Sequence, residues 1–83
     1  MSEEKPRMVE NWEVKHSIFL GGHEIVFAED ESHMKNPYFV GDCNYDSPFG
    51  IAEYTNCIGT ADYLEAITEY AQRLQTQAEL VRQ

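Results

Sequence analysis

The stretch NWEVKHSIFLGGHEIVFAE, residues 11 to 29, carries the clearest structural signal in the chain. Two runs rich in β-branched and aromatic residues are separated by Gly21 and Gly22. Both central residues of a type I′ turn need positive φ, which glycine adopts without steric cost. The stretch therefore predicts a β-hairpin. A period of two along its first strand predicts that one face carries Trp12, Val14, His16, Ile18 and Leu20.

The sequence after this hairpin predicts two more strands and a helix. The runs YFVGDCNY (38–45) and IAEYTNCI (51–58) alternate in the manner of strands and are joined by the turn residues DSPFG (46–50). Thr60 is a good helix N-cap, and Asp62 stands where a carboxylate favours the helix dipole. Apolar residues then recur at steps of three and four, which predicts a helix whose buried stripe is Leu64, Ile67, Ala71, Leu74, Ala78 and Val81.

We therefore expect an α+β fold with a four-stranded antiparallel sheet, built from two hairpins, and one C-terminal helix packed across it. Residues 1–10, MSEEKPRMVE, are expected to form a flexible N-terminal arm, and residues 11–83 a single domain. A chain of 83 residues removes only about 60 to 65% of its unfolded surface from water on folding, so it has room for one modest core.

Charge and hydropathy narrow the classes of partner. The net charge of −9 disfavours direct binding to nucleic acid, because cationic side chains must displace the counterions of a phosphate backbone, and instead favours a basic protein surface. The apolar runs are shorter than a membrane span, and the start lacks the pattern of a signal peptide. The sequence thus predicts a cytoplasmic protein that does not bind a membrane.

The stretch DCNYDSPFGIAE (42–53) has the oxygen spacing of a calcium-binding EF-hand loop, with Asp42, Asn44 and Asp46 at positions 1, 3 and 5 and Glu53 at position 12. The loop glycine of an EF-hand is replaced by Ser47, and β-like segments stand where its helices belong. A hairpin connection is the better interpretation. The histidines and cysteines lack the close pairs of a zinc site, so we expect no metal and no cofactor.

We also expect no enzymatic activity, because no nucleophile stands beside a recognisable base and no phosphate-binding loop occurs. Cys43 and Cys57 are expected to be free thiols, with a disulfide as the less favoured alternative.

Acidic residues gather in three groups along the chain. The first group is the run Glu29–Glu31, and the second surrounds the second turn with Asp42, Asp46 and Glu53. The third follows one helix face at Asp62, Glu65 and Glu69. A solubilising surface would explain such groups. A functional interpretation is that the carboxylates imitate a phosphate backbone and bind a basic groove, with nearby aromatic side chains as anchors. The expected partner-binding residues are Glu29, Asp30, Glu31, Asp42, Tyr45, Asp46, Phe49, Glu53 and Tyr54.

The spacing of the helix stripe also fits a coiled-coil seam. Packing of the helix on its own sheet is the favoured use, and a homodimer is the alternative, with Leu80 and Val81 extending beyond the sheet to a second copy. The protein is therefore expected to be a monomer or a homodimer.

Residues 36–77, about half of the chain, resemble small proteins and domains of unknown function carried on bacterial mobile elements, such as conjugative elements and prophages. The resemblance rests on PYFV, on C-x-Y-D-x-P-F-G and on the DYLE that opens the helix. It implies a compact β-plus-helix module. By setting and acidity the chain also resembles anti-CRISPR and antirestriction inhibitors, several of which mimic DNA.

The leading hypothesis is thus a non-catalytic acidic protein that inhibits a bacterial RNA-guided or restriction nuclease. The alternative is a structural or accessory protein-interaction module of a mobile element, as a monomer or a homodimer, without inhibitory activity.

Overall fold

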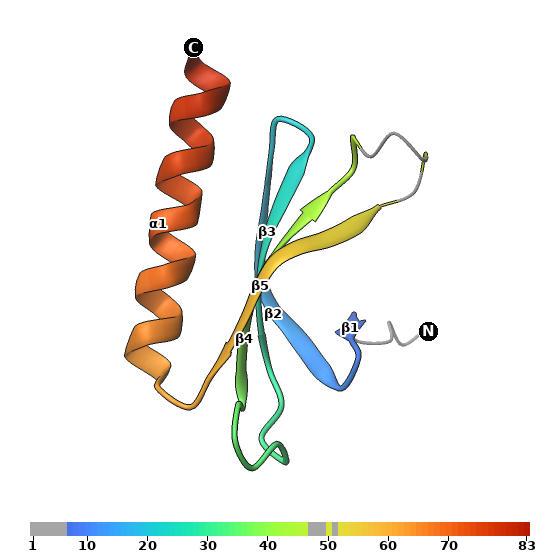
Figure 1. Cartoon of the computed structure of the whole chain (residues 1–83), viewed down its shortest axis with the longest axis vertical. Coiled ribbons are helices and arrows are strands. Elements are labelled where there is room, and N and C mark those ends of the chain that lie inside the picture. The colour runs from blue at the N-terminus through green and yellow to red at the C-terminus, as the bar shows by residue number, and fades with distance from the viewer. Residues whose placement is uncertain (1–6, 47–49, 51) are drawn as a thin grey trace, which may run out of the picture.

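The computed structural model describes residues 7–46, 50 and 52–83. It shows an α+β fold in which one C-terminal helix packs on an antiparallel sheet, as expected (Figure 1). The sheet has five strands in the order β1-β2-β3-β4-β5, so the prediction of four was wrong. The elements are β1 (Met8–Val9), β2 (Trp12–Leu20), β3 (His23–Glu29), β4 (Tyr38–Asn44), β5 (Glu53–Thr60) and α1 (Tyr63–Arg82).

The additional strand, β1, lies inside the segment that the sequence assigned to a flexible arm. Met8 pairs with Glu13 and Val9 with Trp12, so β1 turns back on the start of β2. A strand of two residues is too short to show a periodic pattern, so β1 could not be predicted from the sequence. Residues 1–6 of the expected arm lie outside the described residues.

The predicted hairpin over residues 11–29 is confirmed. Leu20 pairs with His23, and the connecting residues Gly21 and Gly22 have φ values of 54° and 81°. Both lie in the left-handed region, as a type I′ turn requires. The remaining neighbours are also joined in chain order, which makes the sheet a continuous meander rather than two separate hairpins.

A β-bulge at Lys15 overturns the prediction that one face of β2 carries all five alternating residues. Val14 pairs with Ala28 and His16 with Phe27, which leaves Lys15 unpaired in the register. Because one extra residue shifts the alternation, side chains before and after it point to opposite faces. Trp12 and Val14 therefore lie on the face away from α1, while the residues after the bulge that face the helix are His16, Ile18 and Leu20.

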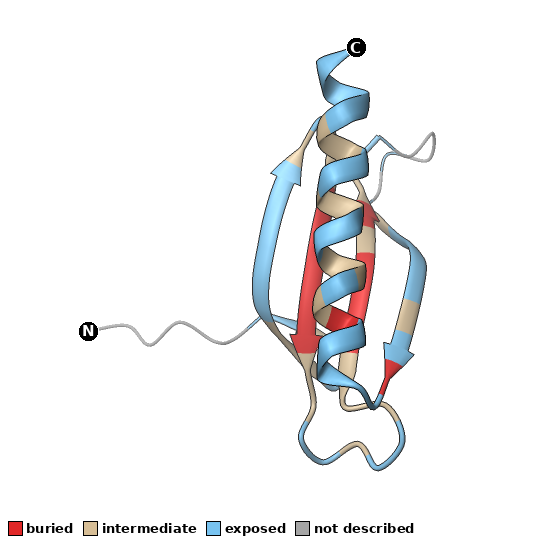
Figure 2. Ribbon diagram, turned by 90° about the vertical axis from the view of Figure 1, so that its left-hand side faces the viewer, coloured by how far each residue is buried: buried red, intermediate tan, exposed pale blue. Residues whose placement is uncertain are grey.

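The sheet consequently has apolar packing on both faces. On the helix-covered face, Phe27, Val40 and Ala66 are buried together, with Ile67 and Tyr70 against them. On the helix-free face the buried residues are Val26, Ala28 and Phe39, covered by Val9, Trp12 and Val14. Figure 2 shows the helix along the middle of the sheet, with the buried residues of the central strands behind it and exposed outer strands on both sides.

Helix α1 begins two residues later than predicted. Asp62, rather than Thr60, is the N-cap, and its carboxylate accepts hydrogen bonds from the backbone N–H groups of Leu64 and Glu65. Thr60 supports this cap, because its hydroxyl oxygen accepts from the N–H of Asp62 at 3.1 Å. A cap of this kind contributes about 1 kcal/mol.

The predicted buried stripe of α1 is only partly correct. Ala66 is the fully buried residue of the helix, and Tyr70 packs against Phe27. By contrast, Leu64 is 72% exposed and Ala71 is exposed. An α-helix turns by about 100° per residue, so the side that meets the sheet is rotated by roughly a quarter turn from the predicted stripe. The large rings of Tyr63 and Tyr70 also contact the core at Phe27, and the predicted stripe did not include them because it was built from aliphatic residues.

The end of α1 contacts the β2–β3 turn instead of extending free beyond the sheet. The Gln77 side chain donates a hydrogen bond to the carbonyl of Leu20 at 3.1 Å. A Cβ at Gly21 would clash with Cγ2 of Val81, so Val81 contacts the backbone of the turn. Leu80 stays 57% exposed.

No helix in the described part of the chain is long and apolar enough to cross a membrane. Cys43 and Cys57 are both free, in agreement with the expected thiols.

Candidate interaction surfaces

The predicted site residues lie in three separate places rather than on one surface. Glu29, Asp30 and Glu31 lie where β3 ends, whereas Asp46 and Glu53 lie at the opposite end of the sheet, near the β2–β3 turn. Asp42 lies on the helix-covered face, and Tyr45 and Tyr54 lie on the helix-free face. Phe49 is outside the described residues.

The first surface, here called the acidic end, consists of Glu13, Glu29, Asp30 and Glu31. All four line one open pocket of about 480 Å³, which Lys15 and Met8 also line. Glu13 and Glu29 are direct cross-strand partners. Like charges in that position repel each other, so their pairing costs stability unless a cation approaches. Lys15 reaches Glu13 at 3.5 Å, but both side chains are largely exposed, so this ion pair contributes little.

Asp30 is held ionised at the acidic end. The Ser32 hydroxyl donates a hydrogen bond to Oδ1 of Asp30 at 2.6 Å, and the N–H of Ser32 donates to the same atom at 3.0 Å. Hydrogen bonds to the charged form lower the pKa of the Asp30 carboxyl. The loop therefore presents a fixed negative charge beside Glu29 and Glu31.

The second surface, here called the aromatic face, surrounds a buried carboxylate on the helix-free face. Glu24 is only 8% exposed, and its two carboxylate oxygens receive the guanidinium of Arg7 at 2.6 Å each. The hydroxyl of Tyr45 donates to Glu24 at 2.8 Å, and Arg7 also donates to the Tyr54 hydroxyl at 3.0 Å. Phe19 packs against Tyr45 with ring centroids 5.3 Å apart and the ring planes tilted by 55°.

These contacts shift the pKa values of the groups involved. The fork of Arg7 is the largest cause that lowers the pKa of Glu24 to about 2, with Tyr45 adding to the effect. The same hydrogen bond from Tyr45 raises the pKa of its phenol to about 12, because it stabilises the protonated form. Glu24 is thus a permanent anion that ties residues before β2 to the centre of the sheet.

Exposed rings cover this network. The side chains of Phe19, Tyr45 and Tyr54 are 59%, 44% and 37% exposed. Aromatic residues, Met and Arg are the residue types enriched at protein interfaces. Two of the three aromatic anchors expected from the sequence therefore belong to a surface that is separate from the acidic end.

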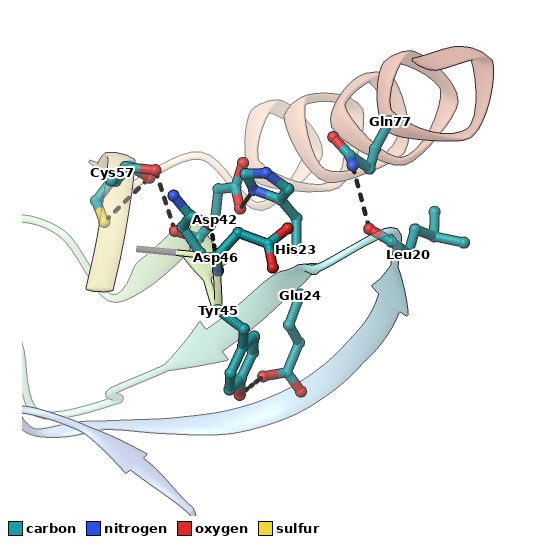
Figure 3. A network of polar contacts seen from close by, with 10 residues as sticks. Leu20, His23, Glu24, Asp42, Tyr45, Asp46, Cys57 and Gln77 are labelled. Atoms are coloured by element: carbon teal, nitrogen blue, oxygen red, sulfur yellow. Dashed lines mark hydrogen bonds and ion pairs between the residues drawn. The ribbon is translucent and has the colours of Figure 1, made fainter. Parts of the chain in front are cut away.

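The third place is a polar groove between α1 and β5, with a cavity volume of about 630 Å³. Its walls include Asp42, Cys57 and Arg73. Asp42 pairs with Nδ1 of His23 at 2.9 Å, and Arg73 donates through Nε to Glu69 at 2.7 Å. Figure 3 shows His23 and Asp42 on the side of the sheet that carries α1, and Glu24 with Tyr45 on the other side.

The chemistry of the groove is weak. Burial raises the pKa of the Cys57 thiol, which keeps it protonated and a poor nucleophile at neutral pH. Nη1 of Arg73 is buried without a hydrogen-bond acceptor among the described residues, but it is also covered from solvent, so a ligand has no direct access to it. Within the described part of the chain, no three His, Cys, Asp or Glu side chains converge in a way that would hold a metal ion.

The sequence analysis missed Glu24 and Arg7. A signal was present, because Glu24 directly precedes the apolar run IVFA (25–28) of β3, and a buried charge needs a partner. The sequence did not identify Arg7 as that partner, because the two residues are 17 positions apart, and Tyr54 is 47 positions from Arg7.

Comparisons of the chain with models of protein families, with curated proteins and with solved structures found no match.

Proposed function

We propose that this protein is a non-catalytic acidic binding protein that inhibits a bacterial RNA-guided or restriction nuclease by occupying part of its nucleic-acid channel. The observation that carries the proposal is the acidic end. Four carboxylates share one open pocket there, and two of them, Glu13 and Glu29, are cross-strand partners despite their like charge. The repulsion between Glu13 and Glu29 costs stability, and such a cost is expected where charged residues serve to bind a partner.

The physical basis is the same as for nucleic-acid binding, with the roles reversed. A nuclease channel is lined by Lys and Arg that contact phosphates, and a run of closely spaced carboxylates offers the same charge at fixed positions. The net charge of −9 adds a long-range attraction that speeds encounter with a basic surface. Because this attraction is screened by ions, inhibition should weaken as the salt concentration rises.

The test is a DNA-cleavage assay on purified RNA-guided and restriction nucleases, carried out with the full chain at several salt concentrations. Two variants carry the same net charge and differ only in where two acids are neutralised. One is Glu29→Gln with Glu31→Gln, at the acidic end. The matched control is Asp46→Asn with Glu53→Gln, at the other end of the sheet. The first should lose at least about tenfold in apparent affinity, a difference of roughly 1.4 kcal/mol, and the control should lose little.

Equal loss in both variants would show that overall charge, rather than the acidic end, is responsible. Full inhibition by the Glu29→Gln, Glu31→Gln variant would exclude the acidic end as the site.

The aromatic face favours a second candidate function, an accessory protein-interaction module of a mobile element. Exposed Phe19, Tyr45 and Tyr54 around an ion pair have the composition of an interface core. In a binding assay with a candidate partner encoded by the same element, Phe19→Ser should abolish binding, whereas the acidic-end variant should bind normally. The reverse pattern would support the inhibitor instead.

A further inference from the structure

One side of α1 carries apolar residues of which the fold leaves about half exposed. The apolar flank, as we call it, consists of the predicted stripe: Leu64, Ile67, Ala71, Leu74, Ala78 and Val81. Ile67 and Leu74 are half-buried, but Leu64 and Val81 are 72% and 50% exposed. The helix residues that face the polar groove, such as Gln72 and Thr76, lie on the opposite side of α1. The apolar flank therefore points away from β5 and toward β2.

The apolar flank is also the uncharged side of the helix. The glutamates of α1, Glu65, Glu69 and Glu79, lie at positions that face the other flank or solvent. The residues that border the apolar flank on its outer side are Thr68, Gln75 and Arg82. In a chain with a net charge of −9, a second copy is repelled from most directions. This flank is a side on which two copies can approach without bringing carboxylates together.

The spacing of the flank is a heptad pattern, with Leu64, Ala71 and Ala78 at one core position and Ile67, Leu74 and Val81 at the other. In an antiparallel pair of identical helices, Leu64 meets Val81 of the second copy. Ile67 then meets Ala78 of the second copy, and Leu74 meets Ala71. Each alanine is thus opposite a large side chain, which fills the space between the helices.

A parallel pair would instead place each alanine opposite its own copy. Two such layers would leave voids at residues 71 and 78, and voids cost packing energy. The size pattern therefore distinguishes the two orientations. In an antiparallel pair the side chains that border the seam on its outer side also meet without like charges, since Thr68 of one copy approaches Gln75 of the other.

We propose that two copies of this chain associate through the apolar flank of α1, with the two helices antiparallel about a two-fold axis. The proposal concerns a surface distinct from the acidic end, and it stands whether or not the protein inhibits a nuclease. A seam of one helix per copy is a small interface, so the dimer belongs to the weak, transient class.

Sedimentation velocity of the full chain over a concentration series tests the association. Ala71→Glu places two carboxylates across the seam of each dimer and should weaken association by at least tenfold. Gln72→Glu is the matched control, because it adds the same charge one residue further on, about 100° around the helix, and should change association little. Ala71 and Gln72 are both exposed in the monomer, so both variants should retain the far-ultraviolet circular dichroism of the parent. A parent chain that stays monomeric throughout, or equal effects of the two variants, would overturn the proposal.

A spin label at Leu64→Cys, in a chain that also carries Cys57→Ser, tests the orientation. In the antiparallel pair residue 64 and its copy are offset by seventeen residues along the axis, so the labels should lie about 26 Å apart. In a parallel pair they would be separated by only about 10 Å, the distance between helix axes. A single short distance would refute the antiparallel arrangement.

Discussion

On the helix-covered face of the sheet, Phe27 is buried by a helix that contacts it through the rings of Tyr63 and Tyr70. On the helix-free face, Val26 and Ala28 are equally buried, with 0% exposure, although no helix in the described structure covers them. Their cover comes from side chains of the sheet itself and of β1, with Trp12 stacked on Phe39 at 5.2 Å. The comparison teaches that this small domain closes its second face with a few large rings and one ion pair, rather than with a second layer.

The bulge at Lys15 is what allows β2 to serve both faces. It sends Trp12 and Val14 to the helix-free face and His16 to the helix-covered face, where His16 lies against Phe27 with centroids 5.9 Å apart. Bulges bend a strand and increase its twist, which suits a sheet that must wrap around one helix.

The largest expected effect is therefore that of deleting Lys15. Without the extra residue, Trp12 and Val14 would have to turn to the other face or force a register shift along β2. The packing of these two half-buried side chains and the ladder hydrogen bonds of β2 before the bulge would be lost together, at a cost of about 3 to 6 kcal/mol. Urea denaturation followed by Trp12 fluorescence measures the loss. Lys15→Ala keeps the bulge and is the control, with a change below about 0.5 kcal/mol. Similar stability of the deletion variant and the parent would show that the bulge does not separate the faces.

This case shows where the sequence was informative. Gly21 and Gly22 predicted the first hairpin, because a turn with two positive φ values accepts few residue types other than glycine. A bulge at lysine has no such residue preference, so the predicted alternation of side chains along β2 continued past Lys15 without a break. A second register shift lies between β4 and β5, where Val40 pairs with Ile58 but Asp42 pairs with Thr55. Asn56 has a φ of 50° there, a conformation that asparagine tolerates better than most residues, so this irregularity has a residue preference that the sequence shows.

The candidate site was harder to predict than the fold. Asp42 and Tyr45 are near in sequence, but alternation along the strand and its continuation sends them to opposite faces, where Asp42 meets His23 and Tyr45 meets Glu24. Charge composition predicts a class of partner, whereas the register of the meander determines which acids come together. Glu13 joined the acidic end through its cross-strand position, which depends on the register between β2 and β3.

The second effect concerns the helix-covered face. Phe27→Ala should cost about 3 to 5 kcal/mol, because it removes the ring that joins β3 to α1 and leaves a cavity. The helix has few other buried contacts, so its signal should be lost first. We expect far-ultraviolet circular dichroism to fall at a lower urea concentration than Trp12 fluorescence, whereas both probes should change together in the parent. Coincident transitions in the variant would show that the two faces unfold as one unit.

The smallest effect concerns the ion pair on the helix-free face. The pKa of Glu24 is about 2 in the folded chain and 4.5 in the absence of its partners. Because folding lowers this pKa, the contribution is fully present above pH 4.5 and is lost as the pH falls toward 2, where the folded carboxylate also takes up a proton. The shift corresponds to about 3 kcal/mol, and exposure of the Arg7 side chain at 42% reduces the expected value to about 1 to 2 kcal/mol.

Glu24→Gln isolates this contribution from the other carboxylates. At pH 7 the variant should unfold at a lower urea concentration than the parent, and the difference should shrink steadily below pH 4.5, because the protonated parent then resembles the variant. Glu79→Gln, at an exposed helix position, should follow the parent at every pH. A difference between Glu24→Gln and the parent that stays constant down to pH 2 would assign the role of Glu24 to packing and neutral hydrogen bonds. The helix-free face would then be held by its apolar packing, without help from charge.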